Sequence, residues 1–270
     1  MKYIDFYIDI FTAKKILPQM NRVNIGIVGC GFIGGALKRW VEEHNPEVRI
    51  FVSDPPKGMN DDLSNVDVVF FSIHVPTEND GTQDLSLTKD LIRKLPDVPV
   101  FVRTTILPGT SEMLSNETGH RVYFMPEFLT ERTAYEDFCA QPMVFTAEEE
   151  LLSKIFKGKR YVSMTSLEAE LTKYAHNVFG ALKVTYFNGI YEICKKLEAN
   201  YKNVQQGILL SGYINPPHTQ VPGPDGKFGY GGKCFPKDVN AFAEHFKNMP
   251  IASLLKTLKP LNIHYRGEDK

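Results

Sequence analysis

The 270-residue sequence lacks an excess of charge of either sign, because 31 Lys and Arg stand against 32 Asp and Glu and leave a net charge of −1. Non-specific binding of nucleic acid needs a positive field, so nucleic acid is not an expected partner. The sequence also lacks any run of about 18 apolar residues, the length that spans a bilayer. Asp5 and Asp9 interrupt the apolar N-terminus, where a signal peptide needs an unbroken stretch. We therefore expect a soluble, cytoplasmic protein without membrane contact.

Cysteine is scarce, and its four copies are scattered over Cys30, Cys139, Cys194 and Cys234. No CxxC pair and no His spacing of the kind found in zinc sites accompanies them, so neither a metal site nor a disulfide framework is expected. Disorder is excluded as the main state, because 43% of the residues are apolar and 23% are charged. The length suffices for one large domain or two smaller ones.

Short apolar runs separated by turn signals recur from about residue 23 to residue 160. The runs read VNIGIVG, VRIFVSD, VDVVFFSIHVP, VPVFVRTTILP, RVYFMPEF and PMVFTA. Two of the connections carry apolar residues at helical spacing: Ile33, Leu37, Trp40 and Val41 in the first, and Leu87, Leu91 and Leu95 in the second. Strands and helices that alternate in this way predict right-handed crossovers and a doubly wound parallel sheet.

A different pattern begins at Thr165. Thr165-Ser-Leu-Glu168 has the form of a capping box, and apolar residues follow every three or four positions for some thirty residues. This predicts one helix on the order of 45 Å long, which is long enough to link domains or to form a dimer interface. Gly180 and Gly189 lie inside it, each at a cost of about 1 kcal/mol relative to Ala. We expect other groups to pack closely against the backbone there.

Residues 212–232 hold too many Gly and Pro for regular structure, and further helices are expected at about 236–246 and 251–264. The predicted fold class is therefore α/β: an N-terminal Rossmann-like doubly wound parallel sheet, followed by a long helix and a small helical region. The expected divisions are an N-terminal extension (1–22), a Rossmann domain (23–163) and a helical central or dimerisation domain that carries the Cys234 loop (164–270).

The sequence GCGFIG at 29–34 follows the first predicted strand and opens a helix. Gly29 permits a tight turn, Gly31 lets a pyrophosphate approach the backbone, and Gly34 lets helix and strand pack closely. Asp54 ends the next strand, and its carboxylate can accept hydrogen bonds from ribose hydroxyls. The same carboxylate would repel a 2′-phosphate. This predicts an NAD site in preference to NADP, the alternative being a glycine turn that binds nothing.

Polar residues follow the carboxyl end of each predicted strand, where open α/β sheets bind ligands. They are Asp54, His74 to Thr77, Thr104, Thr105, Pro126 and Glu127. We expect them to line one crevice, although strand ends are also polar simply because they meet loops.

Cys234 stands at the start of a predicted helix, since Pro236 fits the first turn. The helix N-terminus together with Lys233 and Lys237 is expected to favour the thiolate, so Cys234 is a candidate nucleophile and not a small buried apolar residue. Lys173 and Asn177, four residues apart, share one face of the long helix and could stabilise an oxyanion. Their spacing alone is equally consistent with an exposed lysine and a structural asparagine.

In their order along the chain, six motifs resemble the UDP-glucose dehydrogenase family. They are GxGxxG at 29–34, HVPTENDGTQDLS at 74–86, TTILPGT at 104–110, MPEFLTE at 125–131, AELTKYAHNVFGALKVTYFN at 169–188 and HTQVPGPDGKFGYGGKCFPKD at 218–238. The last is the most specific, because other Rossmann dehydrogenases lack a cysteine there. Such enzymes oxidise the C6 alcohol of a nucleotide sugar to a carboxylate in two steps with two NAD.

The resemblance implies that Cys234 attacks the sugar aldehyde and that the resulting thioester is hydrolysed. It implies that Lys173 and Asn177 bind the C6 oxygen. It also implies that Thr105, Glu127 and Asp238 take part in proton transfer and water activation. The implied cofactor contacts are Gly29, Gly31, Phe32, Ile33, Gly34, Asp54, Thr77, Glu131 and Lys237. The implied substrate contacts are Phe128, Leu129, Phe228, Gly229 and Gly231. The loop at 212–232 is expected to close over the sugar.

Family members normally continue into a second Rossmann-like domain that binds the nucleotide, whereas this sequence stops at Lys270. We expect a UDP-hexose substrate, with UDP-glucose favoured, and a homodimer through the long helix. A separate chain that supplies the nucleotide-binding wall is a further expected partner. Two alternatives stay open: a catalytically impaired NAD-binding subunit, and a two-electron dehydrogenase of the 3-hydroxyacid type, which would not need Cys234.

Overall fold

The computed structural model describes residues 22–78 and 80–267, so the predicted extension at 1–22 lies outside it except for Arg22. The first part of the chain forms a six-stranded sheet in the order β3-β2-β1-β4-β5-β6. The strands of this sheet are β1 (Asn24–Val28), β2 (Arg49–Asp54), β3 (Met59–Asn60), β4 (Val68–Phe71), β5 (Val100–Val102) and β6 (Val122–Phe124). All neighbouring pairs are parallel except β2 with the short edge strand β3. The predicted doubly wound parallel sheet is confirmed.

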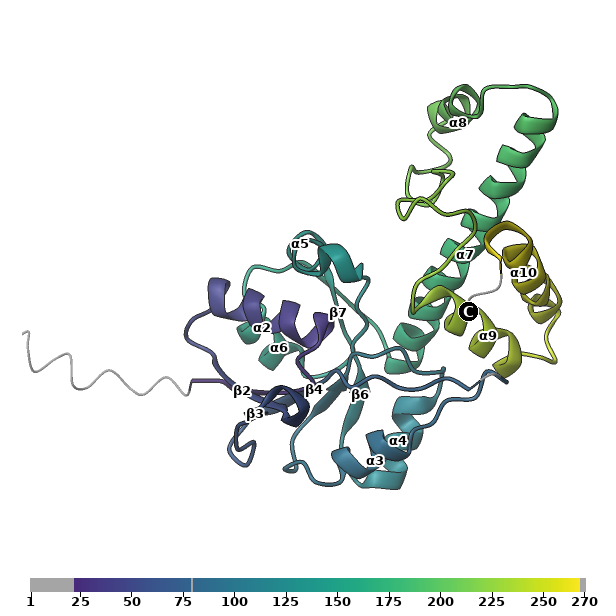
Figure 1. Ribbon diagram of the computed structural model, residues 1–270. Helices are drawn as coiled ribbons and strands as arrows, with labels where there is room; N and C mark the ends of the chain where they lie inside the picture. Colours follow the sequence, from purple (N-terminus) through teal and green to yellow (C-terminus); the bar gives the residue numbers. More distant parts are fainter. Residues whose placement is uncertain (1–21, 79, 268–270) are drawn as a thin grey trace, which may run out of the picture.

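Both faces of the sheet are buried. Along β4, Val68 and Phe70 belong to one apolar cluster and Val69 and Phe71 to the other, and all four are 0% exposed. Successive side chains of a strand point to opposite faces, so a strand covered on both sides is apolar throughout. The covering helices are α2 (Phe32–His44), α3 (Ser86–Ile92), α4 (Thr110–Thr118), α5 (Ala134–Ala140) and α6 (Glu149–Ile155) (Figure 1).

Two details of the predicted sheet domain are wrong. The run PMVFTA forms β7 (Met143–Phe145), which pairs with β8 (Tyr161–Ser163) in a separate two-stranded parallel sheet. Of the stripe expected from Leu87, Leu91 and Leu95, the last two pack against the core, but Leu87 is exposed. Thr88 and Ile92 supply the buried positions of α3.

The second part of the chain is helical and is built on α7 (Ser166–Lys196). Thr165 and Glu168 form the predicted capping box. From the sheet, α7 extends to α8 (Tyr201–Leu210), which the sequence did not predict, and α9 (Phe235–His245) and α10 (Pro250–Arg266) pack beside it (Figure 1). The shared core of α7, α9 and α10 includes Tyr174, Val178, Phe242, Leu255 and Leu258. The segment between α8 and α9 is irregular, as predicted.

Candidate functional site

The glycine turn between β1 and α2 has the predicted geometry. Gly29 has a φ of +84°, which side chains disfavour, and a Cβ at Gly34 would lie 2.1 Å from the Gly29 carbonyl oxygen. A Cβ at Gly31 would meet no atom within 4 Å, so the backbone is open on that side. The first turn of α2, which contains Phe32 and Ile33, carries no acidic residue. The turn lies beside the point where the strand order reverses, the usual ligand site of such sheets.

Asp54 ends β2 and is 8% exposed. Its Oδ2 atom accepts a 2.8 Å hydrogen bond from the backbone N–H of Cys30, inside the glycine turn. The ammonium of Lys57 lies 3.8 Å from the same oxygen and donates to the Cys30 carbonyl at 2.6 Å. Asp54 therefore fixes the shape of the turn, and its role toward a ribose stays a prediction.

The loop after β4 contains two buried hydroxyls, Ser72 Oγ and Thr77 Oγ1, that have no hydrogen-bond partner among the described residues. Such groups are rare in native structures and point to a ligand or an ordered water. His74 in the same loop has a pKa lowered by burial and by the charges of Lys237 and Lys233. The loop therefore faces the beginning of α9, where Cys234 lies.

Gln83 joins the sheet domain to α7. Its Nε2 atom donates to the Thr105 carbonyl at 3.1 Å and to the Tyr174 hydroxyl at 3.2 Å, and its Oε1 accepts from the Leu107 N–H at 3.0 Å. Glu170 makes a second connection, because its carboxylate accepts from the N–H groups of Gly109 at 2.6 Å and Ser111 at 2.8 Å. These bonds hold the TTILPGT loop against α7.

Four of the predicted catalytic side chains meet as two buried pairs. Lys173 donates to the Glu127 carbonyl at 2.5 Å and to Glu127 Oε1 at 3.1 Å. Asn177 donates to Asp238 Oδ2 at 2.6 Å, and Lys237 lies 2.5 Å from Asp238 Oδ1. Lys173 and Asn177 are 3% and 4% exposed, so the interpretation of an exposed lysine is wrong.

Cys234 is the N-cap of α9, and Lys173, Glu127, Asp238 and Lys237 all act on its thiol. The expectation that its surroundings favour the thiolate is nevertheless wrong, because the pKa of Cys234 is raised. Although part of the residue reaches solvent, packing around the thiol is the largest cause, and the charge of Asp238 adds to it. Lys237 and Lys173 lower the pKa without overcoming those two effects.

Around this centre the structure places some of the predicted ligand contacts and separates others. Phe128 lies beside it, with its ring centroid 5.5 Å from Lys173 Nζ and 4.9 Å from the His176 ring. Leu129 donates its N–H to Glu127 Oε2 at 2.6 Å. Glu131 pairs with Lys233, the residue before Cys234, at 3.2 Å.

Phe228 and Gly229 contact α7 beyond the candidate site, and Gly231 lies against Arg266 at the end of α10. Phe228 packs on Tyr191 at 5.4 Å between ring centroids, and the Gly229 N–H donates to Asn188 Oδ1 at 3.0 Å. A Cβ at Gly231 would lie 2.2 Å from the Arg266 guanidinium. At 1.5 Å per residue, Asn188 is about 16 Å along the helix axis from Asn177. Their role as substrate contacts stays a prediction.

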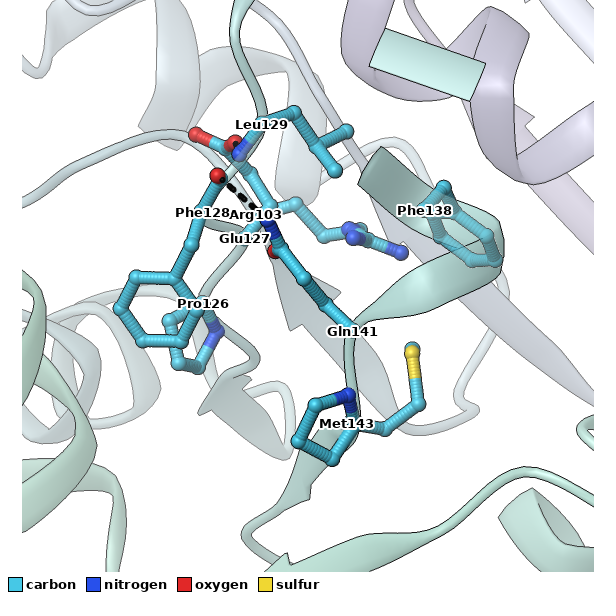
Figure 2. A pocket seen from close by; sticks show the side chains of 9 residues that line it. Arg103, Pro126, Glu127, Phe128, Leu129, Phe138, Gln141 and Met143 are labelled. Carbon is cyan, nitrogen blue, oxygen red and sulfur yellow. Dashed lines mark hydrogen bonds between the residues drawn. The ribbon is translucent and has the colours of Figure 1, made fainter. Parts of the chain in front are cut away.

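Sequence reasoning missed Gln83, Glu170 and Arg103. Gln83 and Glu170 lie inside quoted motifs, but nothing local indicates their partners. Arg103 directly precedes the TTILPGT motif and is 1% exposed, and no pattern in the sequence predicts that this arginine is buried. It lines a cavity with Glu127, Phe128 and others (Figure 2).

The parallel sheet with a glycine turn at its reversal point defines a Rossmann-type α/β protein. Lys173 and Asn177 on α7 and Cys234 at the start of α9 form its candidate site. Residues 167–263 match the central domain of the UDP-glucose/GDP-mannose dehydrogenase family. The chain is 32% identical to the UDP-glucose 6-dehydrogenase of Rickettsia bellii over 214 residues, which cover 72% of this chain and 48% of that protein. It is 32% identical to the enzyme of the same name from Rhizobium meliloti over 203 residues, 66% of this chain and 45% of that protein.

Among solved structures, a UDP-glucose dehydrogenase from Pyrobaculum islandicum superposes with a TM-score of 0.76 at 23% identity, covering 92% of this chain and 70% of that one. This likeness concerns the fold. Residues 167–263 thus carry the central domain of the UDP-glucose/GDP-mannose dehydrogenase family, and the similarity to UDP-glucose 6-dehydrogenases extends over 72% of the chain. It spans about half the length of the curated relatives that it matches.

Proposed function

We propose that the protein contributes to NAD-dependent oxidation of the C6 hydroxyl of a UDP-hexose, with UDP-glucose favoured, to the uronic acid in two steps. The observation that carries this proposal is the meeting of Lys173, Glu127, Asn177 and Asp238 beside Cys234 at the mouth of the sheet. A two-electron dehydrogenase has no use for a thiol in this place.

The residues present fit NAD. The open backbone at Gly31 and the acid-free first turn of α2 suit a pyrophosphate, and the orphaned hydroxyls of Ser72 and Thr77 supply polar groups at the neighbouring strand end. Asp54 would disfavour the extra phosphate of NADP. Glu131 and Lys237 complete the proposed contacts. Bound NAD would accept the two electrons removed from C6 in each oxidation.

In the proposed reaction, Lys173 and Asn177 orient the C6 oxygen and stabilise its negative charge, and Glu127 takes the hydroxyl proton, directly or through the Thr105 hydroxyl or a water. The Cys234 sulfur then adds to the aldehyde carbon and forms a thiohemiacetal. Its oxidation gives a thioester, which water cleaves to the acid and the free thiol. The covalent bond prevents loss of the aldehyde between the two oxidations. The raised pKa of Cys234 suits a thiol that must lose its proton only when the aldehyde is present.

The experiment is to supply NAD and UDP-glucose and to follow NADH and released sugar acid, with UDP-N-acetylmannosamine and GDP-mannose as comparison substrates. Cys234→Ser is expected to form NADH without releasing acid, and Cys139→Ser, at an exposed cysteine far from the site in the sequence, is the matched control. Absence of NADH with every nucleotide sugar, with or without a chain that supplies further nucleotide contacts, would refute the proposal.

We further propose a homodimer through α7. The stripe expected on this helix does not face its own core throughout, because five of its large apolar side chains are exposed. They are Leu167 (56%), Leu171 (45%), Phe179 (61%), Tyr186 (57%) and Ile193 (53%). At 100° per residue these positions share one face of the helix, and exposed apolar patches of this kind mark interfaces.

Phe179→Glu is expected to convert the dimer into a monomer, since it places a charge in the middle of that face. Light scattering coupled to gel filtration measures the mass. Leu210→Glu on α8 is the control, because Leu210 is 88% exposed and lies outside the face. Equal masses for wild type and Phe179→Glu would contradict the dimer.

A further inference from the structure

Arg103 is the largest buried residue whose charge has no hydrogen-bonded partner among the described residues. It follows the last residue of β5 and is 1% exposed, and neither Nε nor Nη1 has a hydrogen-bond partner in the described part of the chain. Burial lowers its pKa to about 10, so it is still a cation at neutral pH. Buried charges persist when something nearby compensates them, so Arg103 needs a counterion.

The guanidinium borders a small open cavity and points toward the Phe138 ring, 5.4 Å from its centroid (Figure 2). Most of the lining is apolar. Gln141 is already engaged, because its Nε2 donates to the Phe128 carbonyl at 3.0 Å. Glu127 is the one carboxylate in the lining, so any anion from outside would have to lie beside it. The counterion that the cavity itself provides is Glu127.

Glu127 thus interacts electrostatically with two cations that come from different elements. Lys173 reaches it from α7, while Arg103 approaches from the end of β5, and the charge of Glu127 raises the pKa of Arg103 against the effect of burial. From the start of α9, Cys234 also senses Glu127, whose charge raises the pKa of the thiol. The remaining contact is the Leu129 N–H at 2.6 Å.

The two hydrogen bonds that Lys173 donates to Glu127 create a conflict with its proposed role. The ammonium must leave at least one of them to bind a substrate oxygen. Glu127 is 6% exposed in the structure. Without Lys173, its carboxylate would keep the hydrogen bond from the Leu129 N–H, and a buried carboxylate with so little compensation favours taking up a proton.

We propose that Arg103 is a positioning residue that takes over the Glu127 carboxylate when Lys173 turns to the substrate. Arg103 thereby keeps Glu127 ionised and releases Lys173. This inference rests on the proposed function only for the statement that Lys173 binds substrate. The exchange itself involves three residues of this chain and can be measured without substrate.

The test is the pKa of Glu127, followed by carbon-13 NMR of labelled glutamate carboxyls and assigned by the resonance that Glu127→Gln removes. Lys173→Met imitates the departure of the lysine. We expect the Glu127 pKa to stay well below neutral in Lys173→Met and to rise by at least one unit more in the double variant with Arg103→Met. Arg103→Lys in place of Arg103→Met should abolish the additional rise. Equal pKa values in Lys173→Met and both double variants would overturn the proposal.

Lys159→Met is the matched control. Lys159 is a second cation against the Phe138 ring, at 5.0 Å from its centroid, but it donates to backbone carbonyls at the end of α5 and not to Glu127. It should leave the Glu127 pKa unchanged. Should Arg103→Met fail to fold, Arg103→Gln removes the charge while keeping polar atoms.

Kinetics separates this inference from the proposed function. Arg103→Met is expected to lower kcat at least tenfold and to move the acid limb of the pH profile of kcat to higher pH. Arg103→Lys should return the acid limb to its wild-type position. Unchanged kcat and an unchanged limb would overturn the positioning role even if the NMR cycle succeeds. If wild type forms no NADH with any nucleotide sugar, the proposed function fails, and the NMR cycle still decides whether Arg103 holds Glu127.

Discussion

Asp238→Asn should make the thiol of Cys234 more reactive. Asp238 is 0% exposed and its charge raises the Cys234 pKa. Cys234 and Asp238 are four residues apart at the start of α9, which places their Cβ atoms about 5–6 Å apart. Two unit charges about 6 Å apart interact by about 2.8 kcal/mol at an effective dielectric constant of about 20. That energy is equivalent to about a hundredfold change in the ratio of thiolate to thiol and is an upper bound.

The interaction energy between the two charges is smaller than this upper bound, because Lys237 already pairs with Asp238 and because Cys234 reaches solvent. We take about half of that energy, equivalent to about tenfold more thiolate at any pH below the thiol pKa. The assay is iodoacetamide alkylation at pH 7, read from the mass of the peptide that contains Cys234 so that the other cysteines do not contribute. Asn at position 238 can still accept from Asn177, so the fold should be retained.

Lys237→Met is the opposing variant. Lys237 lowers the Cys234 pKa, so its removal should slow alkylation under the same conditions. An alkylation rate in Asp238→Asn that is equal to or below that of wild type would show that the Asp238 charge does not hold the thiol protonated.

Two further substitutions test the contacts that assemble the site. Glu170→Ala leaves two backbone N–H groups of the TTILPGT loop and α4 without an acceptor, and at about 1–3 kcal/mol for each it should lower the free energy of unfolding by about 2–6 kcal/mol. Urea denaturation measures this, and a loss under about 1 kcal/mol would contradict it. Gly180→Ala adds a Cβ 2.6 Å from Cζ of Phe235, the neighbour of Cys234, so overpacking of about 1–3 kcal/mol should cancel the gain of about 1 kcal/mol in helix propensity and turnover should fall. Gly207→Ala in α8 meets no atom within 4 Å and should only stabilise, so an equal gain in both variants would refute the contact.

The sheet and the long helix were predictable because their signals are local. Apolar runs bounded by turns predicted five strands of the main sheet. The capping box of Thr165 and Glu168 predicted the residue at which α7 begins. The close packing expected at Gly180 is also present, with the Phe235 ring as the partner. In each case the deciding residues lie within a few positions of the feature that they determine.

Other features depend on partners that are distant in the sequence. The run at 142–147 has strand composition, but nothing in it shows that it pairs with β8 and not with the main sheet. The helix α8 was missed although two local signals for it were present. Tyr201, Val204 and Ile208 recur at helical spacing, and Asn200 caps the helix by accepting from the N–H groups of Lys202 and Asn203.

The positions of several candidate site residues were predicted better than their electrostatics. Lys173, Glu127 and Asp238 act on the Cys234 thiol, and Asn177 pairs with Asp238, while their roles in a reaction stay predictions. The direction of the thiol pKa was wrong, because a count of nearby lysines omits desolvation and the buried carboxylate. Pairing of Lys173 with Glu127 joins an α7 residue to one that follows β6, 46 positions earlier, and spacing along one helix contains no information about it.

The most direct measurement is the mass of the intact protein after it is mixed with NAD and UDP-glucose and quenched in acid within the first turnover. Glu127→Gln, which lacks the carboxylate proposed to take the C6 hydroxyl proton, should slow the formation of the covalent intermediate. The account predicts an added mass equal to the sugar nucleotide acyl group, located on the Cys234 peptide and absent from Cys234→Ser. Release of sugar acid without any adduct, or an adduct on another residue, would contradict it.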